Sequence, residues 1–149
     1  MQPATLSVRS TSQRIPKLQG RKEHLPWLLI RSTWLSPAMA GKVFHANLVA
    51  HTEGLRLHGV FSRSAERRAQ AEADWGVRTY PTYEALLQDQ QVDLVIVATP
   101  HDTHAPMAIQ AVRAGKHVVT DKIMCLTLEE GRAMIEAARQ AGVVFSVFH

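Results

Sequence analysis

Two polar pairs, Thr99-Pro100 and Asp121-Lys122, each follow directly on a strand-like run of residues, 94–98 and 117–120. Neither run alternates between apolar and polar residues, which predicts parallel strands that are buried on both faces. Ligands bind beyond the carboxyl ends of such strands, so we expect both pairs to face one crevice. A lysine in that position can hold a substrate hydroxyl or carbonyl and tune proton transfer. Taken alone, Lys122 is more commonly a solvent-exposed strand-end lysine.

The segment from Ser36 to Gly41 lies where a dinucleotide-binding fold places its phosphate loop. The usual pattern, Gly-x-Gly-x-x-Gly, allows a tight turn and a close approach of the pyrophosphate to the backbone. Only the third glycine, Gly41, is present here, because Ser36 and Ala38 replace the first two. Pro37 also removes an N–H that could bind a phosphate oxygen. Locally this is an ordinary loop, and only the surrounding elements favour a nucleotide loop.

The second predicted strand ends in Ser62-Arg63, where NAD-binding folds normally carry an acid for the ribose hydroxyls. A hydroxyl and a guanidinium can instead hold a 2′-phosphate, which favours NADP over NAD as the cofactor. A surface arginine near a helix start is an equally good interpretation of Arg63.

His101, His104 and Cys125 are the candidate ligands for a metal site. The set lacks a second cysteine pair or a carboxylate partner, so the sequence predicts no metal. Capping or surface roles are favoured for both histidines. Met124 and Cys125 are expected to pack against the core.

Helical and strand patterns alternate from residue 41 onward. Helix caps are predicted at Ser64, at Thr127 and, for the helix ends, at Gly76, Gly115 and Gly142. This alternation predicts an α/β fold, a three-layer Rossmann-like doubly wound parallel sheet. The predicted strands are 55–61, 77–80, 92–98, 117–120 and 143–148, and the predicted helices are 41–50, 65–75, 82–87, 102–114 and 127–141. A first strand at 28–30 is apolar but is interrupted by residues 31–33.

The composition fits one globular domain, with 46% hydrophobic and 20% charged residues. No run of about 18 apolar residues occurs, so no membrane segment is expected. The single cysteine excludes an internal disulfide and fits a reducing compartment, which indicates the cytoplasm.

The positive charge is concentrated at the amino terminus. Residues 1–35 carry six Lys and Arg side chains and one Glu, whereas residues 36–149 carry eleven basic and twelve acidic side chains. The body therefore gives no electrostatic reason to expect a nucleic-acid partner. We expect residues 1–22 to be a separate basic head and residues 23–149 to be the folded domain. The head has three open interpretations: a disordered tail, a transit-like segment, or sequence foreign to the ancestral fold.

Several of these features together resemble the Gfo/Idh/MocA family of NAD(P)-dependent sugar and polyol oxidoreductases. The resemblance rests on 92–100, His104, 114–118 and Asp121-Lys122, with 41–46 similar to the start of that family's first helix. It covers about residues 38–149, which correspond to the amino-terminal Rossmann-like domain. The family's second domain, which provides substrate and oligomer contacts, is not in this sequence.

The resemblance implies hydride transfer between nicotinamide and a sugar- or polyol-like alcohol. Lys122 matches the catalytic lysine of the family's Glu-Lys-Pro motif, while Asp121 replaces the glutamate and Ile123 replaces the proline. The implied cofactor-binding residues are Ser36, Ala38, Gly41, Ser62, Arg63, Thr99, Pro100, His104 and Asp121. The alternative from another functional class is a non-catalytic dinucleotide-binding or interaction module, or an inactive remnant.

Overall fold

The structure is a computed structural model that describes residues 27–32 and 45–149. The expected head, the proposed domain start at residue 23 and the loop residues Ser36, Ala38 and Gly41 lie outside the described residues.

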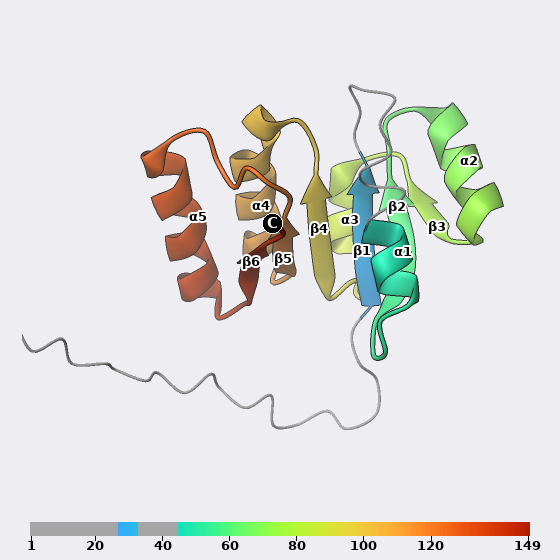
Figure 1. The fold of residues 1–149 in the computed structure, drawn as a ribbon, viewed down its shortest axis with the longest axis horizontal. Helices are drawn as coiled ribbons and strands as arrows, with labels where there is room; N and C mark the ends of the chain where they lie inside the picture. The colour runs from blue at the N-terminus through green and yellow to red at the C-terminus, as the bar shows by residue number, and fades with distance from the viewer. Residues whose placement is uncertain (1–26, 33–44) are drawn as a thin grey trace, which may run out of the picture.

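A single parallel sheet of six strands forms the centre of the fold (Figure 1). Its spatial order is β3-β2-β1-β4-β5-β6, the strand order of doubly wound dinucleotide-binding folds, so the predicted fold class is confirmed. The strands are β1 (Trp27–Ser32), β2 (Arg56–Phe61), β3 (Arg78–Tyr80), β4 (Leu94–Ala98), β5 (His117–Thr120) and β6 (Phe145–Val147).

The weakly predicted first strand is central to the sheet. β1 pairs with β2 on one side and with β4 on the other, and its pairing runs through Arg31 and Ser32. Arg31 and Ser32, which were expected to interrupt the strand, therefore belong to it. Hydrogen bonds to strands on both sides hold a central strand in place even where its apolar pattern is poor.

Helices cover both faces of the sheet in three layers (Figure 1). α1 and α2 lie on one face, and α3, α4 and α5 lie on the other. The helices are α1 (Ala46–Ala50), α2 (Ala65–Trp75), α3 (Tyr83–Gln88), α4 (His104–Arg113) and α5 (Leu128–Ala141), with the 3-10 turn η2 (His101–Thr103) before α4. The helix predicted from residue 102 thus starts as this tighter turn.

The predicted helix caps are confirmed. The Ser64 side chain accepts a hydrogen bond from the backbone N–H of Arg67, and Thr127 and Glu130 form a reciprocal capping box. Gly76 and Gly142 end α2 and α5 with φ angles of 60° and 66°, a left-handed conformation that glycine adopts at little cost.

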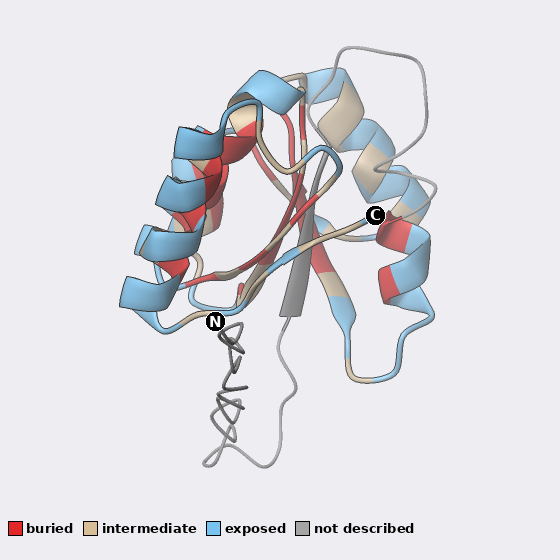
Figure 2. Ribbon diagram, turned by 60° about the vertical axis from the view of Figure 1, so that its left-hand side comes forward, coloured by how far each residue is buried: buried red, intermediate tan, exposed pale blue. Residues whose placement is uncertain are grey.

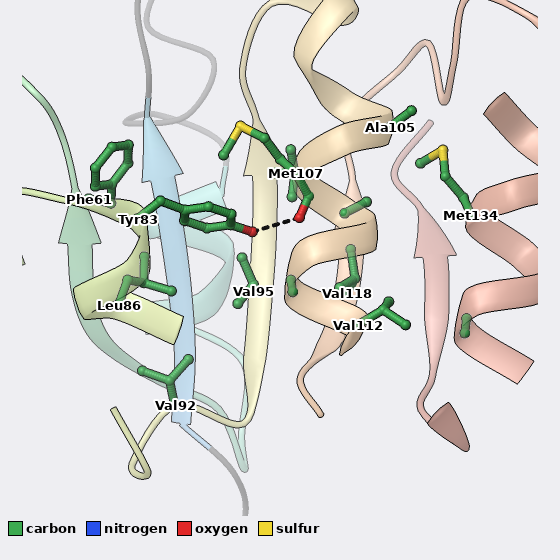
Figure 3. Packing of buried hydrophobic residues seen from close by; sticks show 14 of the residues in the cluster. Phe61, Tyr83, Leu86, Val92, Val95, Ala105, Met107, Val112, Val118 and Met134 are labelled. Atoms are coloured by element: carbon green, nitrogen blue, oxygen red, sulfur yellow. Dashed lines mark hydrogen bonds between the residues drawn. The ribbon is translucent and has the colours of Figure 1, made fainter. Parts of the chain in front are cut away.

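Successive residues of β4 bury against opposite helical layers, as expected for a strand covered on both faces. Val95 and Val97 pack on the α3–α4–α5 side, and Ile96 packs against α1. Figure 3 shows the larger cluster, in which the Tyr83 hydroxyl donates a 2.8 Å hydrogen bond to the Met107 carbonyl oxygen and ties α3 to α4. Figure 2 shows the same division, with the buried residues of the helices on their inward faces and exposed residues on their outer faces. No helix within the described ranges is long and apolar enough to cross a membrane.

Asp89, directly after α3, ties together the strands on one side of the sheet. Its Oδ2 accepts hydrogen bonds from Tyr80 OH at 2.6 Å and Arg78 Nη1 at 2.7 Å, and lies 3.3 Å from His58 Nε2. Its Oδ1 accepts the Gln91 backbone N–H at 2.8 Å. One carboxylate therefore joins side chains of β2 and β3 to the α3–β4 connection.

The electrostatics of this cluster follow from burial and hydrogen bonding. Burial alone would raise the pKa of Asp89, but hydrogen bonds from Tyr80, the Gln91 amide and Arg78 outweigh it and hold that pKa well below its usual range. Burial and the hydrogen bond to Asp89 raise the pKa of Tyr80 to about 12. Lys116, which donates to the Asp89 carbonyl oxygen at 2.8 Å, has its pKa lowered by burial, against the attraction of nearby acids.

Replacement of this carboxylate should weaken the fold in a pH-dependent way. Asp89→Asn is expected to lower the free energy of unfolding at pH 7 by about 1–3 kcal/mol, because it removes a charged acceptor. The lowered pKa means that the stabilisation is present above pH ~4 and is lost as the pH falls through the folded-state pKa. Urea unfolding at stepped pH should therefore show the gap between wild type and variant narrowing in acid. The exposed control Asp102→Asn should show neither effect, and an equal gap at every pH would contradict the account.

Candidate active site

The strand register brings the predicted site segments to one edge of the sheet. Ser32 pairs with Ala98, Val97 pairs with Thr120, and Thr120 pairs with Val147. β1, β4, β5 and β6 therefore end level with one another. Thr99-Pro100 and Asp121-Lys122 leave the sheet at this common carboxyl edge, as the sequence predicted.

The turn after β2 presents Arg63 at the same edge. Arg63 is exposed, whereas Ser62 is buried and its Oγ accepts the Ser64 backbone N–H at 3.3 Å. Arg68 Nη1 donates to the carbonyl oxygens of Ser62 at 2.8 Å and Arg63 at 3.2 Å. Ser62 and Arg68 thus fix the turn and leave the Arg63 guanidinium at the surface, a role for Arg68 that the sequence did not reveal.

The turn after β4 is closed by hydroxyl groups. The Thr103 Oγ1 lies 2.6 Å from the Thr99 Oγ1 and 2.7 Å from the Pro100 carbonyl oxygen, and the Thr103 backbone N–H donates to that same carbonyl. Thr99 is buried and Pro100 is partly exposed. Thr99 therefore shapes the turn, and Pro100 is the more open member of the pair.

His104, the first residue of α4, is completely buried, which corrects the expected surface or capping role. Its Nε2 lies 2.8 Å from the Thr99 carbonyl oxygen, and its Nδ1 lies 2.8 Å from the Ile123 carbonyl oxygen. The ring therefore bridges the loops after β4 and β5. His101 keeps its expected exposure, and its ring meets His104 edge-on at a centroid distance of 5.5 Å.

Lys122 is exposed at the end of β5, and its Nζ lies 5.9 Å from the centre of the Phe148 ring. Asp121 Oδ1 accepts the Lys122 backbone N–H at 2.9 Å, and its Oδ2 lies 3.5 Å from Nε2 of the buried His45. The His45 and Phe148 rings meet edge-on at 4.8 Å. The Lys122–Ile123 peptide bond is cis.

His45 and Phe148 are site neighbours that the sequence reasoning missed. His45 lies immediately before α1 and Phe148 immediately after β6, so the fold brings together residues separated by most of the chain. Both lie inside predicted elements, the helix 41–50 and the strand 143–148, so no sequence signal indicated that they flank the site.

Cys125 and Met124 pack partly buried against the larger core cluster, as expected. A Cβ added to Gly131 of α5 would come within 3.0 Å of the Cys125 Sγ, so the β5–α5 loop lies tightly on α5. In the part of the chain that the structure describes, no group of three or more His, Cys, Asp or Glu side chains could hold a metal ion.

Comparison with known proteins agrees with this geometry. Residues 38–149 match the family GFO_IDH_MocA, described as "Oxidoreductase family, NAD-binding Rossmann fold". The chain therefore belongs to this family of oxidoreductases.

The individual relatives are longer proteins, which the chain matches over part of their length. It is 41% identical over 121 residues to the "Uncharacterized oxidoreductase YdgJ" of Escherichia coli, which covers 80% of this chain and 34% of that protein. It is also 41% identical over 91 residues to the 1,5-anhydro-D-fructose reductase of Ensifer adhaerens, covering 60% of this chain and 27% of that one. The crystal structure of an NAD-binding protein from Listeria innocua superposes with a TM-score of 0.74 at 37% identity, covering 83% of this chain and 35% of that one. The chain thus spans about a third of the length of these relatives.

One buried hydroxyl beneath the site has no observed role. Thr120 is fully buried just before Asp121, and its Oγ1 has no hydrogen-bond partner among the described residues.

Because Val has nearly the same shape without the polar atom, Thr120→Val should raise the free energy of unfolding by about 0.5–1 kcal/mol. Thermal unfolding by circular dichroism would measure the change, with Thr82→Val as a control in which a capping hydroxyl is lost and stability falls. A clear loss of stability in Thr120→Val would show that its hydroxyl is bonded after all.

Proposed function

We propose that this chain is the nucleotide-binding part of an NAD(P)-dependent oxidoreductase that acts in the cytoplasm on a sugar- or polyol-like alcohol. The observation that carries the proposal is the common carboxyl edge, at which an exposed lysine follows β5 beside the turn that ends β4. The name of the Ensifer relative, a reductase of 1,5-anhydro-D-fructose, supports a sugar-like substrate. The single cysteine supports the compartment.

The described residues fit a dinucleotide at this edge. Open parallel sheets with this strand order bind dinucleotides beyond the carboxyl ends of the central strands. The turn after β2 carries no acid and offers an exposed guanidinium on a backbone held by Arg68, which suits the 2′-phosphate of NADP. We therefore propose NADP as the preferred cofactor, with Arg63 as the phosphate ligand.

The chemistry of the chain's own residues follows from their positions. When bound, the nicotinamide supplies or accepts the hydride. Lys122 would hold the substrate oxygen through its Nζ and move the hydroxyl proton, because it is exposed at the edge and free of a carboxylate partner among the described residues. Asp121 fixes the backbone N–H of Lys122, and Phe148 lies under its ammonium.

Nucleotide titration by calorimetry tests the cofactor assignment. NADPH is expected to bind more tightly than NADH, although weakly, because Ser36 and Ala38 replace two loop glycines. Arg63→Ala should reduce NADPH affinity by roughly ten- to a hundredfold and leave NADH affinity unchanged, since a charge-assisted phosphate contact contributes about 1.5–3 kcal/mol. Arg113→Ala, a change of another exposed arginine at the far end of α4, is the control.

The same titration on the Ser36→Gly/Ala38→Gly double variant should show tighter binding of both nucleotides. Equal NADH and NADPH affinities in wild type and in Arg63→Ala would contradict the role of Arg63. Unchanged affinity in the double variant would contradict the assigned loop.

Lys122 can be tested by joining the chain to the substrate domain of a sugar-reducing relative. Lys122→Ala should lower the turnover rate by about two or more orders of magnitude, the usual effect of losing a positioned proton-transfer group. Lys122→Arg should be nearly as slow, because a guanidinium keeps the charge but does not release its proton. Cofactor affinity should stay the same, and stability should change by about 0.5 kcal/mol or less. Turnover near the original rate in both variants would show an ordinary strand-end lysine.

A further inference from the structure

His104 occupies the gap between the two loops that form the proposed site. We propose that His104 is a positioning residue: its buried ring lies between the Thr99 and Ile123 carbonyl oxygens, joins the two loops that carry them, and thereby holds Lys122 in place. The proposal rests on the proposed function only in treating Lys122 as the proton-transfer group, since the link itself is a property of the fold.

Two short contacts place the ring between the loops. Each ring nitrogen lies 2.8 Å from a backbone carbonyl oxygen, one from Thr99 and the other from Ile123. A carbonyl oxygen can only accept a hydrogen bond, so any hydrogen bond between the ring and these loops is donated by the ring.

Burial keeps the ring in this position. His104 is completely buried in the first turn of α4. The His101 ring meets it at a centroid distance of 5.5 Å. A buried polar ring is costly unless it is hydrogen-bonded, and the two carbonyl oxygens are the acceptors that the fold places beside its nitrogens.

The β5–α5 loop has few other anchors near Lys122. The Asp121 backbone N–H donates to the Val97 carbonyl oxygen at 2.9 Å, and the Lys122 N–H donates locally to Asp121 Oδ1. The next backbone anchors among the described residues are the Leu126 and Thr127 N–H groups, both held by Glu130. The Ile123 side chain is 52% exposed and contributes little packing. The contact between the Ile123 carbonyl oxygen and His104 Nδ1 therefore holds the middle of the loop, one residue beyond Lys122.

The position of Lys122 has a spectroscopic signature in the 149-residue chain itself. Because its ammonium lies over the Phe148 ring, a ¹³C-dimethylated Lys122 should give an NMR signal displaced by the ring current. Lys122→Arg assigns the signal, and Phe148→Leu gives its undisplaced position. His104→Leu should move the signal most of the way to that position, His104→Gln should restore part of the displacement by keeping a donor, and the exposed control His101→Leu should leave it unchanged.

A second measurement covers the case in which His104→Leu fails to fold. The imidazole N–H proton of wild-type His104 should exchange slowly with solvent, because the ring is buried and donates to a backbone carbonyl oxygen. Fast exchange of this proton, or a displaced Lys122 signal that persists in a folded His104→Leu variant, overturns the proposal. No nucleotide is present in either measurement, so the result does not depend on cofactor binding.

Discussion

The site depends on the hydrogen-bonded pairing of β4 with β1 on one side and β5 on the other. This pairing sets Ala98 opposite Ser32 and Val97 opposite Thr120, so neighbouring strands end at the same height. A shift of register by one residue would turn the strand side chains toward opposite faces and stagger the ends. The exposed residues Arg63 and Lys122 lie at the same carboxyl edge because the strands that precede them end level with one another.

Polar side chains hold the two edges of the sheet in different ways. At the edge away from the site, Asp89 gathers cationic and hydroxyl donors, and one carboxylate satisfies several partners. At the site edge, two buried histidines contact the loops that follow the strands. His104 faces the carbonyl oxygens of Thr99 and Ile123, and His45 lies beside Asp121. Lys122 is the exposed residue between Asp121 and Ile123, the two residues that these histidines contact.

Much of the fold could be predicted because its signals are local. The caps at Ser64 and Thr127 and the left-handed glycines at 76 and 142 depend on neighbouring residues, and the structure has each of them in place. The shared edge was also predictable, since level ends are a general property of parallel strands.

The remaining features depend on contacts between distant parts of the chain. β1 was underestimated because its place in the sheet comes from two neighbouring strands, whereas its own apolar pattern is short. His104 was expected at the surface because its spacing from His101 says nothing about the carbonyl of Ile123, nineteen residues away. The nearness of His45 to Asp121 likewise depends on how α1 packs on the sheet, which no local pattern encodes.

The most direct test of the central claim is to map nucleotide binding onto the backbone amides of this chain by NMR. If the carboxyl edge is the cofactor site, titration with NADPH should shift the amide signals of Arg63, Thr99 and Lys122 while those of Asp89 and Gly142, at the opposite edge, stay in place. Shifts confined to the opposite edge, or no shifts at millimolar NADPH in the Ser36→Gly/Ala38→Gly variant, would contradict the account.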